Sequence, residues 1–284
     1  MRPPVPSLAG RRCFVTGAAS GIGRATALAA AGRGADLYLT DLAAEGLEET
    51  AAAVRAAGGR VSFARAADVT DHEAIVAMAA EIHAAHGSMD VVMNVAGISI
   101  WGAIERLDHD HWQRAIDVDL VGPISVLESF VPPMIEAGRG GHVVNVSSAA
   151  GLLGLPWHAP YSAAKFGLRG VSEVLRFDLR RHRIGVSLVC PGGVKTPLVG
   201  TVEIVGLDDA DPEVQKLKRR FERHAVSPEH VAEKILAGVE KNRYLVFTSA
   251  DIRLAFWLQR WFPPGYEAIM RALNRRLVAV AEKA

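Results

Sequence analysis

The sequence of 284 residues predicts a doubly wound α/β fold, in which about seven parallel strands form one sheet with helices on both faces. Short runs of β-branched and other apolar residues alternate with longer, alanine-rich amphipathic runs, a rhythm typical of parallel strands joined by helices. Half of the residues are hydrophobic, so the chain can enclose the core of one large domain. Ligands of such folds bind at the carboxyl ends of the strands.

Seven runs have the composition expected of strands. The first, RCFVTG, ends in a glycine cluster, and the second, DLYLTD, alternates apolar and polar residues. Later runs such as HVVNVSS and GVSLVCPGG are rich in valine, as expected of strands. In chain order, the strands are expected at residues 12–17, 36–41, 60–66, 89–97, 142–148, 185–193 and 243–249.

Helices are expected between these strands. The first begins directly after the glycine cluster and ends at further glycines, and Asp71 is placed to cap the third. In chain order, the helices are expected at residues 21–34, 44–57, 71–86, 112–136 and 160–181.

The last third of the chain departs from this rhythm. Residues 198–224 contain GLDDADPE and predict an insertion that acts as a substrate lid. We therefore expect a catalytic domain over residues 1–250 and a helical extension over residues 251–284.

The extension predicts two helices separated by Pro263 and Pro264. Leu254, Trp257, Leu258 and Trp261 fall on one face of the first helix. Basic side chains outnumber acidic ones in this region, six to three. The two helices are expected to cover the substrate entrance or join subunits, or alternatively to make a peripheral contact with a membrane surface.

Overall composition excludes several classes of protein. The formal net charge of +1 gives no attraction toward nucleic acid. Cys13 and Cys190, each within an apolar run, are expected to be buried thiols, and no metal site is predicted. No apolar run reaches about 18 residues, so no membrane-spanning helix is expected and a cytoplasmic location is predicted.

Two short motifs carry chemistry. In TGAASGIG, Gly17, Gly21 and Gly23 lie between a strand and a helix, where glycines let the backbone approach a pyrophosphate. Asp41 ends the next strand, where its carboxylate can bind ribose hydroxyls, repel a 2′-phosphate, or cap the following helix. In YSAAK, Tyr161 and Lys165 share a helix face, so the lysine can lower the pKa of the phenol.

Taken in order, these motifs resemble those of the short-chain dehydrogenase/reductase superfamily, whose members have a Rossmann fold. The matching segments are TGAASGIG, Asp41, the pair DV at 68–69, NVAG at 94–97, NVSS at 145–148, YSAAK at 161–165 and PGGVKT at 191–196. The resemblance implies a nicotinamide cofactor, and Asp41 favours NAD over NADP. It implies cofactor contacts at Gly17, Ser20, Gly21, Ile22, Gly23, Asp41, Asp68, Val69, Asn94, Ala96, Gly97, Tyr161, Lys165, Pro191, Gly192, Val194 and Thr196.

The resemblance also implies a catalytic group. Tyr161 would be the general acid/base, Lys165 would lower its pKa and bind the nicotinamide ribose, and Ser148 would orient the substrate oxygen. Because strand side chains alternate, only one of Ser147 and Ser148 should face the site. Asp119 stands where the family often has a catalytic asparagine, and it is either catalytic or structural. Direct pairing of Asp119 with Lys165 would weaken the effect of the lysine on Tyr161.

The predicted substrate pocket is mostly apolar and has no arginine or lysine to hold an acid. Its expected lining is Ile98, Ile100, Trp101, Ser148, Leu153, Leu155, Trp157 and His158. We therefore expect an NAD-dependent oxidoreductase for a hydrophobic secondary alcohol or its ketone, resembling a steroid, terpenoid or long-chain compound. The alternatives are a different reaction on the same scaffold, such as epimerisation, or a non-catalytic NAD-binding or membrane-associated interaction protein. By resemblance, a homodimer or homotetramer is expected.

Overall fold

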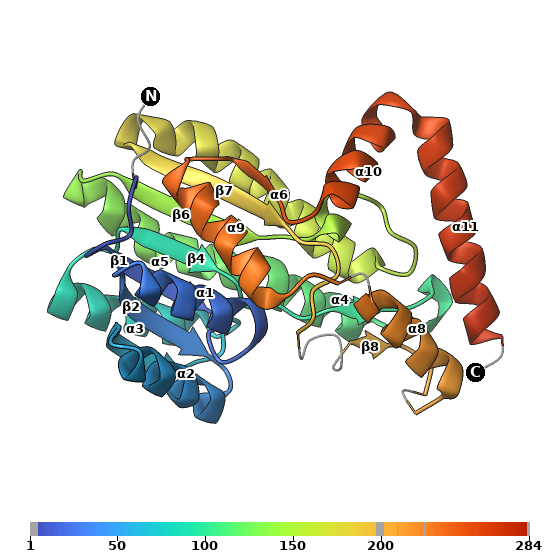
Figure 1. Ribbon diagram of the computed structural model, residues 1–284, viewed down its shortest axis with the longest axis horizontal. Coiled ribbons are helices and arrows are strands. Elements are labelled where there is room, and N and C mark those ends of the chain that lie inside the picture. Colours follow the sequence, from blue (N-terminus) through green and yellow to red (C-terminus); the bar gives the residue numbers. More distant parts are fainter. Residues whose placement is uncertain (1–4, 197–201, 209, 224, 283–284) are drawn as a thin grey trace.

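The computed structural model describes residues 5–196, 202–208, 210–223 and 225–282. Its centre is one seven-stranded sheet with the order β3-β2-β1-β4-β6-β7-β9, and every neighbouring pair is parallel (Figure 1). The strands are β1 (Arg12–Thr16), β2 (Asp36–Asp41), β3 (Arg60–Ala66), β4 (Val91–Asn94), β6 (Gly141–Val146), β7 (Ile184–Cys190) and β9 (Leu245–Phe247). The predicted doubly wound fold is confirmed, and its strand order reverses between β1 and β4, where such folds bind their ligands.

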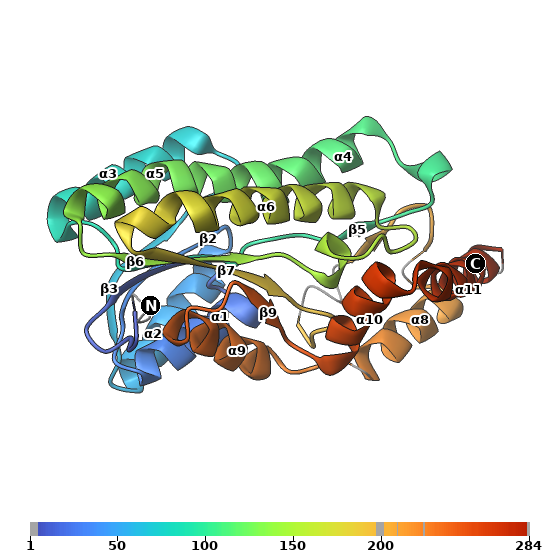
Figure 2. The same cartoon turned by 90° about the horizontal axis from the view of Figure 1, so that it is seen from above.

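Helices cover both faces of this sheet. Figure 2 shows α1, α2 and α9 below the sheet and α3, α5 and α6 above it, with α4 continuing that upper layer. The helices are α1 (Gly21–Gly32), α2 (Ala44–Ala56), α3 (His72–His86), α4 (His109–Ile116), α5 (Gly122–Ala137), α6 (Ala159–Asp178) and α9 (Pro228–Glu240). Asp71 caps α3 as predicted, since its carboxylate accepts from Ala74 N at 2.9 Å. Two separate apolar clusters, one on each face, hold these layers to the sheet.

Helix α9 is absent from the sequence-based prediction. Its signals are present, because the Ser227 hydroxyl accepts from His230 N and Pro228 stands in the first turn. Val231, Ile235 and Leu236 recur at helical spacing and are fully buried beside α1. Helix α9 therefore completes the helical layer on the face of the sheet that α1 covers.

The upper layer contains one helical stretch longer than predicted. Helices α4 and α5 join through a π-helical turn, η2 (Asp117–Val121), and Asp119 lies in this turn. By length and composition, His109–Ala137 could cross a membrane, but half of its most apolar window is buried. Since α5 packs against α3 and β4, we assign it as a core helix of the sheet domain.

The predicted lid is described only in part, because residues 198–201, 209 and 224 lie outside the described residues. Within it, β8 (Glu203–Ile204) pairs in parallel with β5 (Ile100–Trp101), and α8 (Pro212–Arg223) follows. Glu203 contacts His111 at 3.2 Å and Arg114 at 3.0 Å. Backbone and ion-pair contacts thus join the segment after β7 to the segment after β4.

The extension forms α10 (Ala250–Trp261) and α11 (Pro263–Ala281). The first helix ends before the two prolines as predicted, but Pro263 and Pro264 lie in the first turn of α11 rather than between the helices. They project as an inverted V from one end of the body (Figure 1). Phe256 and Tyr266 pack into a cluster with Leu153 and Leu155. The Tyr266 hydroxyl accepts from Gly154 N at 2.9 Å. This packing puts the extension against the loop that follows Ser148.

Candidate active site

The junction of β1 and α1 is packed too tightly for a side chain at Gly17 or Gly23. Gly17 has φ of +69°, and a Cβ there would lie 2.8 Å from Ala96 Cα. A Cβ on Gly23 would lie 1.8 Å from the carbonyl oxygen of Gly17. Ser20 precedes the helix as its N-cap residue without a side-chain capping bond, and Ile22 packs on the lower core. The N-terminal amides of α1 are thereby presented at the carboxyl edge of the sheet, a geometry that suits a phosphate.

Asp41 stands at the carboxyl end of β2, next to this loop. One carboxylate oxygen accepts from Ala19 N at 2.9 Å, and the other accepts from Ala43 N at 2.9 Å. Ala43, rather than Asp41, is the N-cap residue of α2. Asp41 therefore joins the glycine loop to the start of α2 and holds a carboxylate where the sequence predicts a ribose contact.

The carboxyl ends of β1 and β4 are joined by Thr16, a residue that the motif reasoning did not single out. Its hydroxyl oxygen accepts from Val95 N at 3.0 Å and from Ala96 N at 3.1 Å. Thr16 directly precedes the glycine loop and is buried, a signal that could have indicated its role. It fixes the spacing between the glycine loop and the NVAG segment.

The other predicted cofactor residues follow β3 and β4. Asp68 accepts from Thr70 N at 2.8 Å, and Val69 is buried against Gly122 at the start of α5. Asn94 is buried, and its side-chain amide donates to the Asn145 side chain at 2.9 Å. The side-chain oxygen Oδ1 of Asn94 has no partner among the described residues. These residues lie along the same carboxyl edge as Gly17.

The segment after β7 runs past the same edge. Lys195 N donates to Val226 O at 2.9 Å and Val226 N donates to Gly193 O at 3.0 Å, so Val194 lies in a short backbone bridge. Pro191 follows the end of β7, and a Cβ on Gly192 would lie 3.0 Å from Ile252 of α10. Thr196 N donates to Val194 O at 2.9 Å. The PGGVKT segment is thus held between the sheet and α10.

The three predicted catalytic residues converge from β6 and α6. Ser147 and Ser148 follow β6, and their side chains face opposite sides, as predicted from strand alternation. The Ser147 hydroxyl is buried and donates to Lys165 O at 3.1 Å, whereas the Ser148 hydroxyl accepts from Ala150 N at 3.1 Å and lies close enough to the Tyr161 phenol to lower its pKa. Lys165 Nζ lies 5.7 Å from the centre of the Tyr161 ring. One face of α6 therefore presents both the phenol and the amine to Ser148.

Asp119 forms a buried ion pair with Lys165. Its carboxylate oxygen Oδ1 lies 3.1 Å from Lys165 Nζ and also accepts from Ile98 N at 3.1 Å. The side chain of Asp119 is 0% exposed and that of Lys165 is 4% exposed. Lys165 also donates to Val146 O at 3.2 Å. The direct pairing that the sequence raised for Asp119 is present, and the π-helical turn places its carboxylate there.

Gly97 packs directly on this ion pair. A Cβ at Gly97 would lie 2.6 Å from Asp119 Oδ1 and 3.2 Å from Lys165 Nζ. The NVAG segment thus needs a glycine at its last position to let the carboxylate and the ammonium meet.

Burial and neighbouring charges set the titration of the site in opposing directions. Burial raises the pKa of Tyr161 above its usual range, and the negative charge of Asp119 raises it further. The positive charge of Lys165 and the nearby Ser148 hydroxyl both act to lower it. The pKa of Lys165 is raised because attraction to Asp119 and Tyr161 outweighs its burial. Burial raises the pKa of Asp119 despite the attraction of Lys165. Burial therefore outweighs the lowering of the Tyr161 pKa by Lys165.

Aromatic side chains stand beside Tyr161. His158 and Tyr161 have ring centres 6.4 Å apart, and the Trp101 and His158 rings are 4.4 Å apart. Burial lowers the pKa of His158 to about 4, so its ring is neutral near pH 7, and Nδ1 lies 2.6 Å from Pro156 O. The backbone amide of Ile98 donates to the Asp119 carboxylate, which places Ile98 beside Asp119.

Other residues of the predicted lining pack elsewhere. Trp157 joins an apolar cluster with Val202, Ile204 and Val214 of the segment after β7. Leu153 is buried beneath α10, and Ile100 is buried in β5. The structure thus brings His158 close to Tyr161, packs Trp101 against His158 and into the same cluster as Trp157, and uses Leu153 and Ile100 in packing.

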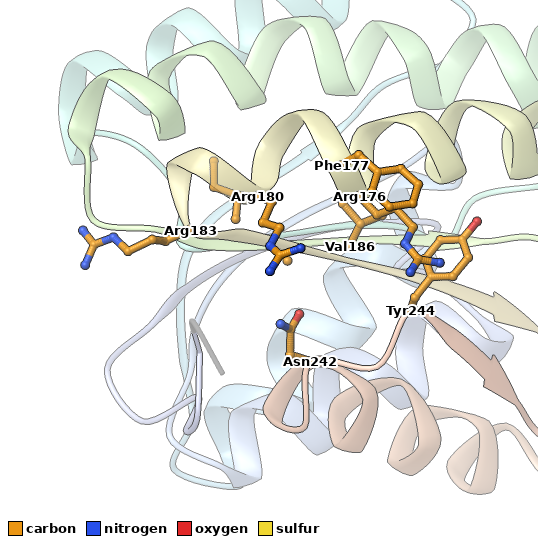
Figure 3. A pocket seen from close by; sticks show the side chains of 9 residues that line it. Arg176, Phe177, Arg180, Arg183, Val186, Asn242 and Tyr244 are labelled. Atoms are coloured by element: carbon orange, nitrogen blue, oxygen red, sulfur yellow. The ribbon is translucent and has the colours of Figure 1, made fainter. Parts of the chain in front are cut away.

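A separate hollow of about 240 Å³ lies away from these residues, between the end of α6 and the start of β7 (Figure 3). It is lined by Arg176, Phe177, Arg180, Arg183, Ile184, Gly185, Val186, Asn242 and Tyr244. The glycine loop and Tyr161 lie at the carboxyl ends of the strands, whereas this hollow lies at the amino end of β7.

A doubly wound sheet with a phosphate-type glycine loop and a Ser–Tyr–Lys group at its carboxyl edge defines a nicotinamide-dependent oxidoreductase. Comparison with known proteins gives the family. A family model described as short chain dehydrogenase matches residues 11–204, and the chain belongs to this family.

Relatives and solved structures agree with this assignment. The chain is 35% identical over 268 residues to a putative oxidoreductase, SadH, from Mycobacterium tuberculosis strain H37Rv, covering 94% of this chain and 96% of that protein. A short-chain dehydrogenase/reductase from Burkholderia phymatum in complex with NAD superposes with a TM-score of 0.81 at 28% identity, covering 89% of this chain and 94% of that one. A metagenomic short-chain oxidoreductase in complex with NADP superposes with a TM-score of 0.68 at 31% identity, covering 84% and 96%. The protein is therefore an oxidoreductase that uses a nicotinamide cofactor.

Proposed function

We propose that the protein is an NAD-dependent dehydrogenase that interconverts a hydrophobic secondary alcohol and its ketone, with Tyr161 as the general acid/base. The observation that carries this proposal is the convergence of Ser148, Tyr161 and Lys165 beside the glycine loop. The neutral His158 beside Tyr161 and the Trp101 ring that packs against His158 favour an uncharged, apolar substrate.

The chain's own residues fit a bound dinucleotide. The glycine loop leaves no room for side chains at Gly17 and Gly23, so backbone amides of α1 can approach a pyrophosphate closely. Asp41 would accept hydrogen bonds from ribose hydroxyls, and its negative charge would repel the 2′-phosphate of NADP. Two of the three N–H groups of Lys165 donate to Asp119 and Val146 O, and the third would donate to the nicotinamide ribose.

Each polar group has a distinct task in the proposed reaction. When bound, an oxidised nicotinamide would supply the acceptor for the hydride that leaves the carbinol carbon. The Tyr161 phenolate takes the hydroxyl proton, so the alcohol loses two electrons and two hydrogens and becomes a ketone. Ser148 donates a hydrogen bond to the substrate oxygen and holds it near the phenol. Lys165 stabilises the phenolate by its positive charge.

The test is a survey of hydrophobic secondary alcohols with NAD or NADP, monitored by the absorbance of the reduced cofactor. We expect turnover with NAD to exceed turnover with NADP by more than tenfold, and Tyr161→Phe to lose nearly all of it while still binding NAD. Calorimetric titration of both proteins with NAD separates binding from chemistry. Full activity in Tyr161→Phe would overturn the catalytic role, and equal turnover with the two cofactors would overturn the preference for NAD.

A further inference from the structure

The outer side of α10 carries large apolar side chains that remain largely exposed. We call Leu254, Trp257, Trp261 and the following Phe262 the outer α10 face. Their exposed fractions are 70%, 46%, 75% and 57%, respectively. Leu254, Trp257 and Trp261 recur at helical spacing and form one stripe. Contiguous exposed aromatic surface of this kind marks an interaction site.

The opposite side of α10 explains why this face is exposed. Ile252, Ala255 and Phe256 pack with Leu152 and Leu153 in the cluster beneath the helix. The Tyr266 hydroxyl fastens the next helix to Gly154. Because the inner side already packs against this cluster, α10 could bury the outer stripe only by separating from the loop that follows Ser148.

Charges beside the stripe indicate the kind of surface that it meets. At about 100° per residue, Arg253 and Arg260 lie together along one edge of the stripe, with Asp251 on the other edge. Both arginines are exposed, and neither forms an ion pair with a described residue. On α11, Arg275 and Arg276 add further exposed positive charge. Tryptophan, leucine and phenylalanine next to arginine suit the boundary between anionic headgroups and acyl chains.

We propose that the outer α10 face docks on an anionic lipid bilayer. The apolar stripe enters the boundary beneath the headgroups, and Arg253 and Arg260 contact the lipid phosphates. A second copy of the chain fits less well, because each copy would bring two unpaired arginines and one aspartate into a symmetric contact. This inference does not depend on the identity of the substrate. It places the membrane next to the loop that follows Ser148, on the side from which an apolar substrate would arrive.

The test is cosedimentation of the full chain with vesicles of phosphatidylcholine alone or mixed equally with phosphatidylglycerol. We expect binding to the mixed vesicles, weaker binding at high salt, and at least tenfold weaker binding to phosphatidylcholine. The variant Trp257→Gln/Trp261→Gln should lose at least tenfold in affinity for the mixed vesicles. Arg253→Gln/Arg260→Gln should bind both vesicles equally weakly. Phe177→Gln, which changes an exposed aromatic side chain on α6, is the matched control and should bind as the wild type does.

Two outcomes with the tryptophan variant would overturn the proposal. One is retention of full vesicle binding by Trp257→Gln/Trp261→Gln. The other is a smaller assembly for this variant in sedimentation velocity without any vesicle binding by the wild type, which would identify a subunit interface. Quenching of wild-type tryptophan fluorescence by brominated lipid gives a measurement that needs no variant, and absence of quenching on the mixed vesicles would also contradict the proposal.

Discussion

At the scale of single residues, Asp119 distinguishes this site from the motif that the family often carries. Its carboxylate shares a buried environment with Lys165 and touches the Gly97 backbone region. A neutral ion pair exerts a smaller field on Tyr161 than a lone ammonium does. The sequence indicated this pairing from residue identity alone, but only the π-helical turn shows why the carboxylate reaches the lysine.

Replacing Asp119 should therefore change the pH profile of the reaction. Asp119 raises the pKa of Tyr161, so Asp119→Asn should lower it and make the phenolate available at lower pH. We expect the acid limb of the oxidation rate to move down by about one pH unit, with turnover preserved or increased. The measurement is the rate of alcohol oxidation against pH.

Asp117→Asn is the matched control, because Asp117 bonds Gln113 and lies away from Lys165. Its profile should coincide with that of the wild type. A hundredfold loss of turnover in Asp119→Asn would show instead that the carboxylate itself is required.

At the scale of elements, the sequence predicts those parts whose local pattern and tertiary role coincide. All seven strands of the main sheet were predicted, because each run is apolar and lies beside turn residues. The strands β5 and β8 have two residues each, so they carry no periodic signal and form only where the two segments meet. Helix α9 was missed although Ser227 and Pro228 mark its start. The predicted cofactor and catalytic residues lie along the carboxyl edge of the sheet, whereas the packing of Leu153 under α10 depends on contacts from a distant part of the chain.

The junction of β1 and α1 allows a sharp test at this scale. A Cβ on Gly23 would collide with Gly17 O, so Gly23→Ala should displace the loop and weaken NAD binding by at least about tenfold, roughly 1.4 kcal/mol. Isothermal titration measures the affinity.

Gly32→Ala lies in the same helix where a Cβ meets nothing within 4 Å. It should keep the affinity and stabilise the protein by about 0.5–1 kcal/mol. Equal affinities for both variants would contradict the role of the loop.

At the scale of the whole molecule, buried histidines link stability to pH. Burial lowers the pKa of His142 to about 3 and that of His158 to about 4. His142 Nε2 lies 2.8 Å from Ser187 Oγ, and its Nδ1 has no partner among the described residues. In the unfolded chain, histidines take up a proton near pH 6.5. Below that pH, the unfolded state therefore binds more protons than the folded state. The contribution of these histidines to the free energy of unfolding is present above that pH and is lost as the pH falls.

We expect the free energy of unfolding to be nearly constant above pH 7 and to fall by a few kcal/mol, in order of magnitude, between about pH 6.5 and 4. His142→Gln should reduce this fall, since the variant has no imidazole to protonate on unfolding. Urea unfolding of both proteins at several pH values measures the difference. His109→Gln, at an exposed histidine, is the control and should follow the wild type. An unchanged slope in His142→Gln would contradict the assignment.

The hydrogen bonds between Tyr266 and Gly154 have a consequence for the order in which the molecule is built. They join residues that are 112 positions apart in the sequence. Strand β5 likewise can pair only after the distant segment that forms β8 has been synthesised. A ribosome completes the glycine loop, the NVAG segment and the Ser–Tyr–Lys group well before it reaches Tyr266. Contacts of such long sequence separation form slowly, because the intervening chain must first be confined. During synthesis, the cofactor side of the enzyme can therefore take shape before the wall of its substrate side exists.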